Sequence, residues 1–375
     1  MAAEVPLIDL SRLEPAVAAV VAGALERVRA SANYLQGDEL AAFEAAFASY
    51  CGTAHCVGVA NGTDALELAL RALGCGPGDR VATVANAGMY ASVAILAVGA
   101  RPLYVDIDAA TMTMSAASLK ALISPAIKAV IVTHLYGRLA DVEAIAAVAR
   151  RHGAGLIEDC AQAHGAERGG VRAGAFAAIG CFSFYPTKNL GALGDAGALT
   201  TDDADLAAAL RALRSYGWSE RFVARRAGGR NSRLDEIQAA VLRAKLPHLE
   251  QWNARRREIA AIYRAELSGL DLVLPETAAG DHVVHMYVVR SARRDDLRAR
   301  LATAGIGCDV HYPLPDYRQP ALAAGLGQAA PLAATEGAMA EILTLPSHPW
   351  ITDAEAAQVA AAVRTACNLR ERGQA

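Results

Sequence analysis

The chain lacks a strongly basic segment of the kind that binds nucleic acids or lipid headgroups. Its 36 Lys and Arg residues are balanced by 39 Asp and Glu residues, which gives a net charge of −3 and a pI near 6.3. Residues 221–230 are the most basic stretch, and their arginines suit either a solvated loop or the recognition of phosphate groups. The charge pattern therefore predicts no nucleic-acid partner and no membrane partner.

Paired cysteine motifs are also missing. The seven cysteines are odd in number, scattered along the chain and never spaced as Cys-x-x-Cys, and the nine histidines never follow a His-x-x-x-His spacing. These absences argue against a disulfide framework and against a zinc site. We predict reduced thiols, no bound metal and a cytoplasmic location.

The sequence has no clear signal peptide or membrane span. Its first residues lack the basic and apolar regions of a signal peptide. Residues 81–100 carry no charge and are long enough to cross a bilayer, but they include Thr83, Asn86 and Ser92. We interpret this run as a buried strand, a turn at 86–90 and a helix.

Apolar residues are plentiful and recur in a regular alternation. The chain is 54% hydrophobic and 20% charged, which is ample for a large core. Short apolar strands alternate with amphipathic helices, and this alternation predicts an α/β fold: a mostly parallel sheet with helices on both faces. The expected strands are 56–60, 81–84, 102–106, 128–133, 155–159, 179–184 and 196–201, and the expected helices are 38–50, one ending at 73, 140–152 and 203–216.

The pattern changes after a long helical stretch at 235–267, which we expect to bend or break at Pro247. The remainder predicts a smaller α+β unit. Its expected elements are a strand at 282–290, a helix at 294–304, a strand at 306–311 and a last helix opened by the capping box at 352–355. We therefore predict a large domain at 1–245, including an N-terminal arm, and a small domain at 246–375.

One lysine has an unusual setting. Lys188 is the only lysine between Lys128 and Lys245, and it lies on a Gly-rich turn after an apolar strand. Asp159 ends an earlier apolar strand. A lysine amine can form a Schiff base with the aldehyde of pyridoxal 5′-phosphate (PLP), and a carboxylate can keep the pyridinium nitrogen protonated. The pair predicts a PLP site with Lys188 and Asp159 as catalytic residues.

A phosphate site is suggested by Asn-Gly-Thr-Asp at 61–64. It lies between a strand and a helix N-terminus, where free backbone N–H groups favour an anion. A helix cap or an Asx turn explains the same residues equally well. We expect the N–H groups and the Thr63 hydroxyl, not the Asp64 carboxylate, to face a phosphate, with Ser183 as a further donor.

Eight ordered motifs extend the pattern along nearly the whole chain. They are Pro-Leu-Ile-Asp-Leu at 6–10, Asn-Gly-Thr-Asp-Ala-Leu at 61–66, Gly-Pro-Gly-Asp at 76–79, His-Leu-Tyr-Gly at 134–137, Glu-Asp-Cys-Ala-Gln-Ala-His-Gly at 158–165, Ser-Phe-Tyr-Pro-Thr-Lys-Asn-Leu-Gly at 183–191, Asn-Ser-Arg-Leu-Asp-Glu-Ile-Gln-Ala-Ala at 231–240 and His-Tyr-Pro at 311–313. Together they resemble the DegT-type sugar aminotransferases, PLP enzymes of the aspartate-aminotransferase fold (fold type I).

The resemblance implies a role for each matching residue. Lys188 would be the Schiff-base lysine and proton carrier, Asp159 would pair with the ring nitrogen, and Gln162 would lie beside the ring. Burial and a nearby cation would lower the pKa of Lys188, and the pKa of Asp159 would stay low beside the ring cation. The other implied cofactor contacts are Gly62, Thr63, Asp64, Met89, Ser183 and, from the partner subunit of a homodimer, Asn231; the implied sugar contacts are Tyr185, His311 and Tyr312.

Two features refine the resemblance. Many relatives place an aromatic ring against PLP where this chain has Met89, so either the Met89 thioether or the adjacent Tyr90 would cover the cofactor. The segments 86–92 and 188–198 resemble the branch that acts on 3-keto sugar nucleotides, whereas enzymes for 4-keto sugars more often carry Gly-Glu-Gly-Gly after the lysine.

The implied reaction is a two-stage transamination. L-glutamate would give its amino group and leave as 2-oxoglutarate, with pyridoxamine phosphate as the intermediate form of the cofactor. A keto-deoxysugar nucleotide (an NDP-3-keto-6-deoxyhexose) would then leave as the aminosugar. The alternatives are amination of a 4-keto sugar and a PLP-fold regulatory protein without turnover. Dehydratase relatives replace the lysine by His, and no Gly-x-Gly-x-x-Gly of a nicotinamide-binding fold follows an early strand.

Overall fold

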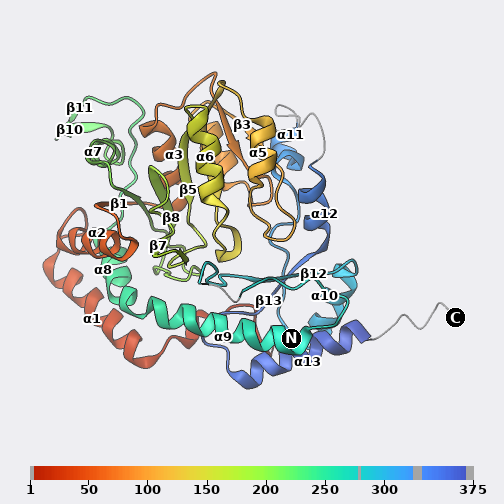
Figure 1. Ribbon diagram of the computed structural model, residues 1–375. Helices are drawn as coiled ribbons and strands as arrows, with labels where there is room; N and C mark the ends of the chain where they lie inside the picture. The colour runs from red at the N-terminus through yellow and green to blue at the C-terminus, as the bar shows by residue number, and fades with distance from the viewer. Residues whose placement is uncertain (1–3, 278–279, 324–331, 369–375) are drawn as a thin grey trace.

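The computed structural model describes residues 4–277, 280–323 and 332–368. Its centre is a seven-stranded sheet with the order β1-β9-β8-β5-β4-β2-β3 (Figure 1). The strands are β1 His55–Val59, β2 Arg80–Thr83, β3 Arg101–Tyr104, β4 Ile127–Thr133, β5 Gly155–Asp159, β8 Ile179–Ser183 and β9 Gly197–Thr201. Strands β3, β2, β4, β5 and β8 pair in parallel, and β9 is antiparallel to both of its neighbours. The predicted α/β class with a mostly parallel sheet is confirmed.

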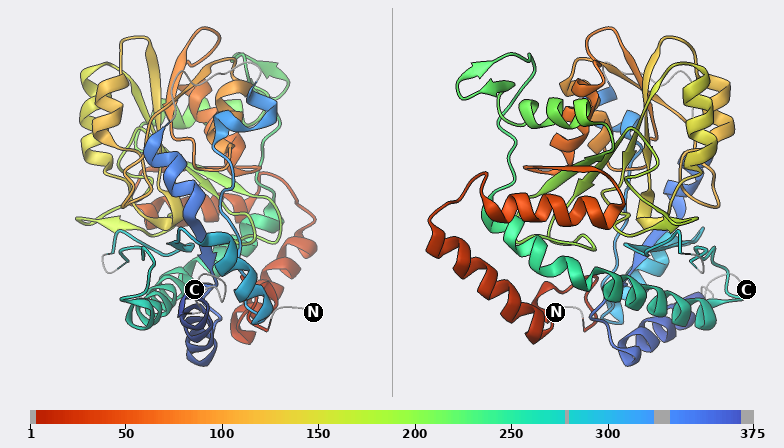
Figure 2. Two further views of the ribbon diagram at one scale, coloured as in Figure 1. Left: turned by 90° about the vertical axis from the view of Figure 1, so that its right-hand side faces the viewer. Right: turned by 60° about the vertical axis from the view of Figure 1, so that its left-hand side comes forward.

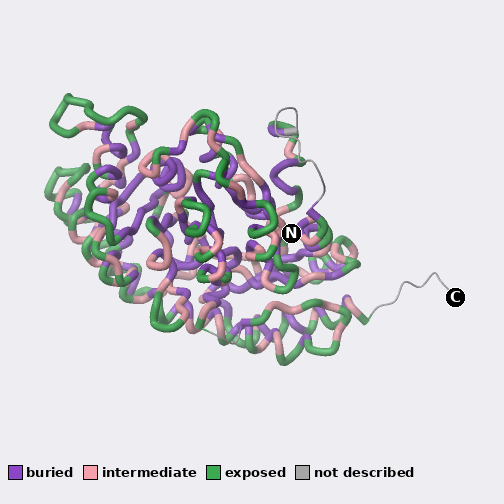
Figure 3. The backbone as a smooth tube through the Cα atoms, turned by 45° about the horizontal axis from the view of Figure 1, so that its top comes forward, coloured by how far each residue is buried: buried purple, intermediate pink, exposed green. Residues whose placement is uncertain are grey.

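Helices cover both faces because successive strand side chains point to opposite sides. Along β4, Ala129 and Ile131 join one core cluster, and Val130 and Val132 join another. Figure 3 shows the central strands as buried and the outer turns of the helices as exposed. The first face packs against α3 Gly62–Ala72, α4 Tyr90–Ala97 and α7 Ala204–Leu213; the second packs against α2 Asp38–Cys51, α5 Ala116–Leu122, α6 Val142–Arg151 and α8 Glu236–Lys245.

A smaller group of elements follows in the C-terminal part. The chain continues from α8 through a short 3-10 turn, η3 Leu246–His248, into α9 Leu249–Leu267. Pro247 lies in that turn, so the predicted break is confirmed. The further elements are β12 Tyr287–Arg290 and β13 Ile342–Leu345, which pair antiparallel, and the helices α10 Arg294–Thr303, α11 Pro320–Ala323, α12 Ala333–Glu341 and α13 Asp353–Asn368. The capping box of α13 is confirmed, since Thr352 and Glu355 bond each other's backbone N–H groups.

The N-terminal segment joins the two parts of the molecule. Helix α1 Pro15–Ser31 packs along α8, which continues through η3 into α9 (Figure 2). Before it, Val5 bridges to Ile306, and Arg12 pairs with Glu355 at 2.7 Å. One continuous core cluster also links the sheet with α9, α10 and α13. The division at residue 245 stays a prediction.

Two expected strands differ from the structure. Residues 306–311 form no strand, because they make only single bridges, Ile306 to Val5 and Asp309 to Thr344. The strand expected at 282–290 is limited to β12, because His282 bridges to Arg138 instead. Elements that the pattern did not predict include α1, α5, α12, β13 and the exposed hairpin of β10 Trp218–Glu220 and β11 Val223–Ala224.

The uncharged run at 81–100 forms most of β2, a turn and α4, as predicted. None of the helices in the described parts of the chain is long and apolar enough to cross a membrane.

Candidate active site

Polar residues gather at the carboxyl edge of the sheet, where the parallel strands end. Thr133 ends β4, Asp159 ends β5 and Ser183 ends β8, while Gly62 opens α3 just after β1. Parallel strands bring their carboxyl ends to one edge, which is where ligands bind in α/β sheets. The topology therefore places residues from four separate motifs side by side.

Lys188 lies on the turn that follows β8, near Asp159. Its backbone N–H donates to the Tyr185 carbonyl at 2.8 Å, which fixes the turn. Burial lowers the pKa of the Lys188 amine to about 8, although the Asp159 carboxylate opposes this shift. The predicted lowering by burial is confirmed. A substantial share of the amine is therefore neutral near physiological pH, as a nucleophile or proton carrier requires.

Asp159 is buried, with an exposed fraction of 6%. Its Oδ1 accepts from the Ala161 N–H at 3.1 Å, and its Oδ2 accepts from the Thr133 hydroxyl at 3.3 Å. Burial raises the pKa of the carboxyl, and the Ala161 N–H and Lys188 lower it less. The predicted low pKa of Asp159 applies to the carboxylate beside the ring cation of the cofactor, and it stays a prediction. A cation placed against the carboxylate, such as a pyridinium nitrogen, would shift that balance.

The segment 61–64 forms a cradle at the start of α3. The Asn61 side chain accepts from the Asp64 N–H at 2.8 Å and so satisfies only one N–H of the first turn. A Cβ on Gly62 would lie 2.6 Å from the Ser183 Cβ, so only glycine allows this close approach. The Asp64 carboxylate lies 3.2 Å from Arg230, which neutralises it. The cradle fits an anion such as the cofactor phosphate.

Gln162 links the sheet edge to the segment 311–312. Its Oε1 accepts from the Tyr136 N–H at 2.6 Å, and its Nε2 donates to the Tyr312 hydroxyl at 3.2 Å. The Tyr136 hydroxyl in turn donates to the His311 carbonyl at 2.5 Å. Burial lowers the pKa of His311, and Lys188 adds to that shift. The structure thus joins three predicted site residues, and it adds Tyr136, which was not among the predicted site residues.

The turn at 88–90 lies against Tyr312. A Cβ on Gly88 would come within 2.9 Å of the Tyr312 ring, and the Tyr90 ring packs edge-on against it, with centroids 6.2 Å apart. In the sequence, Met89 lies between Gly88 and Tyr90. It is the N-cap of α4 and has a φ of 71°. The choice between Met89 and Tyr90 as the cover of the cofactor ring stays a prediction.

Asp316 fixes that turn and was not foreseen. Its Oδ1 accepts from the Met89 N–H at 3.1 Å, and its Oδ2 accepts from the Ser92 hydroxyl at 2.6 Å. It therefore caps α4, because the Met89 side chain offers no capping oxygen. Burial raises the pKa of Asp316 to about 6. No local sequence pattern could indicate a cap that comes from so distant a residue.

Two predicted site residues lie at the surface of the single chain. The Tyr185 side chain is 52% exposed. Asn231 is exposed, and its Oδ1 accepts from Arg233 at 2.9 Å. The next residue, Ser232, accepts from the Ala60 N–H at 3.2 Å, so this segment runs beside the entrance to the cradle.

The chain matches the DegT/DnrJ/EryC1/StrS aminotransferase family over residues 17–364. It belongs to this family. It is 44% identical over 362 residues to a dTDP-3-amino-3,4,6-trideoxy-alpha-D-glucose transaminase of Streptomyces venezuelae, covering 96% of this chain and 95% of that protein. It is 42% identical over 362 residues to a UDP-N-acetyl-3-dehydro-alpha-D-glucosamine 3-aminotransferase of Acidithiobacillus ferrooxidans, covering 96% and 97%.

A solved structure agrees with this assignment. The crystal structure of S. venezuelae DesV in complex with a ketimine intermediate superposes with a TM-score of 0.95 at 42% identity, covering 99% of this chain and 100% of that one. The fold is therefore that of these aminotransferases, and the cofactor is PLP. Its parts fit the buried amine of Lys188, the carboxylate of Asp159 and the cradle at Gly62.

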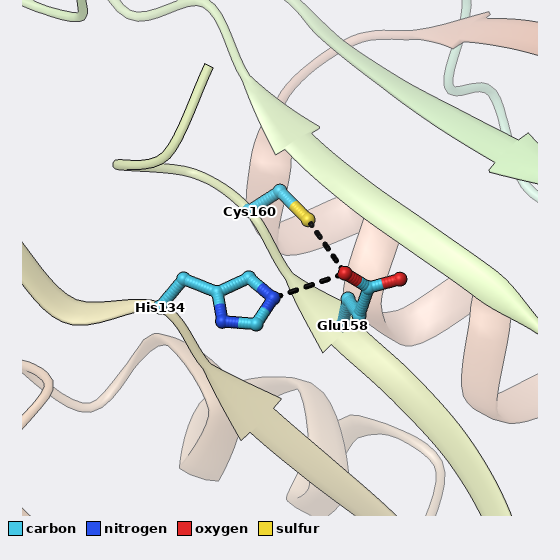
Figure 4. Close-up of side chains that lie close together, drawn as sticks. All are labelled: His134, Glu158 and Cys160. Atoms are coloured by element: carbon cyan, nitrogen blue, oxygen red, sulfur yellow. Dashed lines mark hydrogen bonds and ion pairs between the residues drawn. The ribbon is translucent and has the colours of Figure 1, made fainter. Parts of the chain in front are cut away.

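A second polar cluster of this aminotransferase includes Glu158 and Cys160, the two sequence neighbours of Asp159, together with His134 (Figure 4). Ligand atoms of His134, Glu158 and Cys160 all lie within 4.8 Å of one another. His134 Nδ1 accepts from the Ala140 N–H at 3.1 Å, so its Nε2 carries the proton that it donates to Glu158 at 3.0 Å.

Glu158 also accepts three backbone N–H groups at 2.8–2.9 Å, from Gly174, Phe176 and Ala177. Burial raises the pKa of the Cys160 thiol well above its usual value, which favours the neutral form. The donors and acceptors are thus engaged with one another, and the cluster stabilises the strand ends. His164 is buried against the rings of Phe182 and Phe184, with ring centroids 5.5 Å from each.

Proposed function

We propose that this aminotransferase moves the amino group of L-glutamate to C3 of a keto-deoxysugar nucleotide, an NDP-3-keto-6-deoxyhexose. The observation that carries the proposal is the buried Lys188 amine, with its pKa lowered to about 8, beside the buried Asp159. Position 3 is supported by the names of two relatives that act at this carbon, although their nucleotides and sugars differ.

The residues at the carboxyl edge of the sheet have different roles in the proposed reaction. Bound PLP supplies an electron sink for a negative charge that develops on the substrate carbon. Lys188 holds the cofactor and, when freed, moves the proton, while Asp159 keeps the ring nitrogen charged. The cofactor phosphate is assigned to the N–H groups of Gly62 and Thr63, the Thr63 hydroxyl and Ser183, and Asp64 lines the same cradle. Gln162 lies beside the ring, and Tyr185, His311 and Tyr312 face the sugar.

The active form in this proposal is a homodimer with shared sites, in which Asn231 of the partner subunit reaches the cofactor phosphate. The exposure of Tyr185 and Asn231 in the single chain supports a covering partner. The hairpin of β10 and β11 stands away from the body of the molecule (Figure 1) and carries the 73% exposed Phe222. The exposed Arg221 in the hairpin and Arg225 and Arg226 directly after it suit the diphosphate of a sugar nucleotide.

The test is turnover by the purified protein with PLP and glutamate against a panel of 3-keto and 4-keto sugar nucleotides. We expect release of 2-oxoglutarate that depends on a 3-keto acceptor. Release that depends only on a 4-keto acceptor would contradict the position of amination. Absence of turnover with every acceptor, in protein that binds PLP, would instead favour the regulatory alternative.

A further inference from the structure

A cavity of 310 Å³ opens beside Lys188, on the side of the turn that faces α9. Its walls come from the turn that carries Lys188, the end of α8, α9, the N-terminal segment and the segment around Trp350. The lining residues used below are Lys188, Lys245, Arg256, Trp252 and Trp350. Within the described residues, three cationic side chains line this cavity and no acidic side chain does.

Arg256 is buried, with an exposed fraction of 3%, and lacks a carboxylate partner among the described residues. Its Nη1 donates to the carbonyls of Val284, His285 and Ser347 at 3.4, 3.2 and 3.0 Å. Its Nε is buried with no hydrogen-bond partner. Backbone carbonyls hold the guanidinium in place but leave its charge uncompensated, which is costly in a buried site.

Lys245, like Arg256, is a buried cationic side chain that a backbone carbonyl holds in place. It is 8% exposed, its Nζ donates to the Gly191 carbonyl at 2.8 Å, and the described residues offer it no ion pair. Burial lowers the pKa of its amine. The chain contains four lysines, and two of them, Lys188 and Lys245, line this one cavity. Long cationic side chains are seldom buried without a counter-ion, so the cavity is suited to an anion.

The nearby acid Glu14 does not supply that counter-ion. Its two carboxylate oxygens accept from the indole N–H groups of Trp252 and Trp350, both at 3.1 Å. Glu14 thus orients two aromatic walls of the cavity and does not line it. The positive charge of Lys245 and Arg256 is left for a ligand.

The size and surroundings of the cavity select a small carboxylate. A volume of 310 Å³ is at the lower end for small-molecule sites, which suits an amino acid and is narrow for a nucleotide sugar. A phosphate cradle built from a helix N-terminus already exists at Gly62. A second cavity of 110 Å³ shares Thr187 and Arg256 and reaches His311. Arg256 therefore stands between the lysine and the residues assigned to the sugar.

We propose that Lys245 and Arg256 bind the carboxylates of the dicarboxylate amino donor and of its 2-oxo product, with the donor amine toward Lys188. The assignment rests on the proposed function for the identity of the donor. Once Lys188 is joined to the cofactor, Lys245 and Arg256 remain as two cationic groups, which equals the number of carboxylates of glutamate. Charge-assisted hydrogen bonds from both would hold the donor in one orientation.

Glutarate tests the site directly, because it has both carboxylates and no amine to react. Binding to the PLP-loaded enzyme is measured by calorimetry for the wild type, Lys245→Met, Arg256→Lys and, as a matched control on the same helix, Arg257→Met, a residue that does not line the cavity. Losing one charged hydrogen bond should weaken glutarate binding about 10- to 100-fold in Lys245→Met. Arg257→Met should bind as the wild type does, and thermal melting identifies any variant that fails to fold.

Several outcomes would overturn the assignment. Unchanged glutarate affinity in both Lys245→Met and Arg256→Lys is one. Equal affinity for glutarate and for pentanoate, which has the same five-carbon chain but only one carboxylate, is a second. Inorganic phosphate that binds as tightly as glutarate, and loses affinity in the same variants, is a third and would indicate a phosphate site.

Half-reactions separate this proposal from the proposed function. In single turnovers followed by the cofactor spectrum, Lys245→Met should need at least about tenfold more glutamate for half-saturation. Its second half-reaction, from the pyridoxamine form with the ketosugar, should saturate as in the wild type. If no ketosugar reacts but glutarate binding still depends on Lys245, the sugar assignment fails and the donor site stands. A ketosugar half-reaction that weakens equally would instead place Lys245 in the sugar site.

Discussion

Lys188 and Asp159 influence each other's charge electrostatically in a buried setting. Burial disfavours the charged form of both, lowering the pKa of the lysine and raising that of the acid, and each partly offsets the shift of the other. Opposite shifts of neighbouring groups are typical of catalytic sites. Substitution of either residue therefore tests the proposed role of a single side chain.

The first prediction concerns the covalent bond to the cofactor. Purified protein should be yellow, and Lys188→Ala should lose the absorbance that borohydride reduction removes, because no other amine occupies this position. Lys188→Arg should fail in the same way, since a guanidinium stays protonated. A reducible absorbance that persists in Lys188→Ala would show that a different lysine holds the cofactor.

The second prediction concerns charge at the ring nitrogen. Asp159→Asn should still bind PLP, because the amide keeps the shape of the side chain, but turnover should fall at least ~10²-fold, since a poised charge contributes several kcal/mol at a developing carbanion. Cofactor content and kcat are measured on the same preparation. Near-normal turnover with full cofactor would rule out the ring-nitrogen role of Asp159.

At the scale of elements, α4 depends on a residue far along the chain. Asp316 accepts from the Met89 N–H and the Ser92 hydroxyl and so joins the start of α4 to the C-terminal part. Ser92 also shares a hydrogen bond with the Tyr104 hydroxyl at 3.0 Å. Burial raises the pKa of Tyr104 to about 12, so this neighbour stays neutral over the useful pH range.

The third prediction follows from the raised pKa of Asp316. The ordinary value is 3.8 and the folded value is about 6, so the native state binds the extra proton between these limits. The protonated Asp316 carboxyl therefore makes its full contribution to the free energy of unfolding below about pH 4. This contribution, at most ~3 kcal/mol, is lost as the pH rises through 6. Asp316→Asn should therefore gain stability relative to the wild type between pH 4 and 7.5.

Urea unfolding at several pH values measures this difference directly. The comparison between the two proteins cancels the titration of other groups, because only residue 316 changes. A difference in unfolding free energy that stays constant from pH 4 to pH 7.5 would show that Asp316 is ionised throughout.

At the scale of the whole molecule, the surface distribution suggests an incomplete unit. The site residues Asp159 and Gln162 are buried and Gly62 is half-buried, while Tyr185 and Asn231 are exposed. The hairpin of β10 and β11 stands away from the body of the molecule in Figure 1, and most of its residues are exposed. A second copy would cover these residues in the proposed dimer.

The fourth prediction is complementation between two inactive variants. Lys188→Ala loses the lysine, and Asn231→Asp places a carboxylate against the phosphate. If Asn231 serves the partner's site, a mixed dimer has both lesions in one site and none in the other, so activity returns. If Asn231 serves its own subunit, each site keeps one lesion.

Activity is measured after the two variants are unfolded and refolded together, with each variant refolded alone as the control. Differently tagged subunits confirm that mixed dimers formed. Mixed dimers that remain inactive would contradict the shared site.

The alternation of apolar strands and amphipathic helices in the sequence was enough to predict the strands of the central sheet. Strand-length apolar runs such as 128–133 and 155–159 fold as predicted, because burial on both faces of a parallel sheet requires continuous apolar residues. Prediction failed where pairing depends on distant segments. Residues 306–311 have strand-like composition, but their neighbours Val5 and Thr344 come from two different segments, so no ladder forms.

The sequence by itself determined the chemistry of the site: the motifs around Lys188, Asp159 and Gly62 belong to strand ends, and parallel strands must present those ends together. Only the tertiary structure decided which partners support them. The links from Asp316 to Met89 and from Tyr136 to His311 join residues far apart in the chain, and no local periodicity encodes such contacts. The uncompensated charges of Lys245 and Arg256 likewise became apparent only when folding placed both against one cavity.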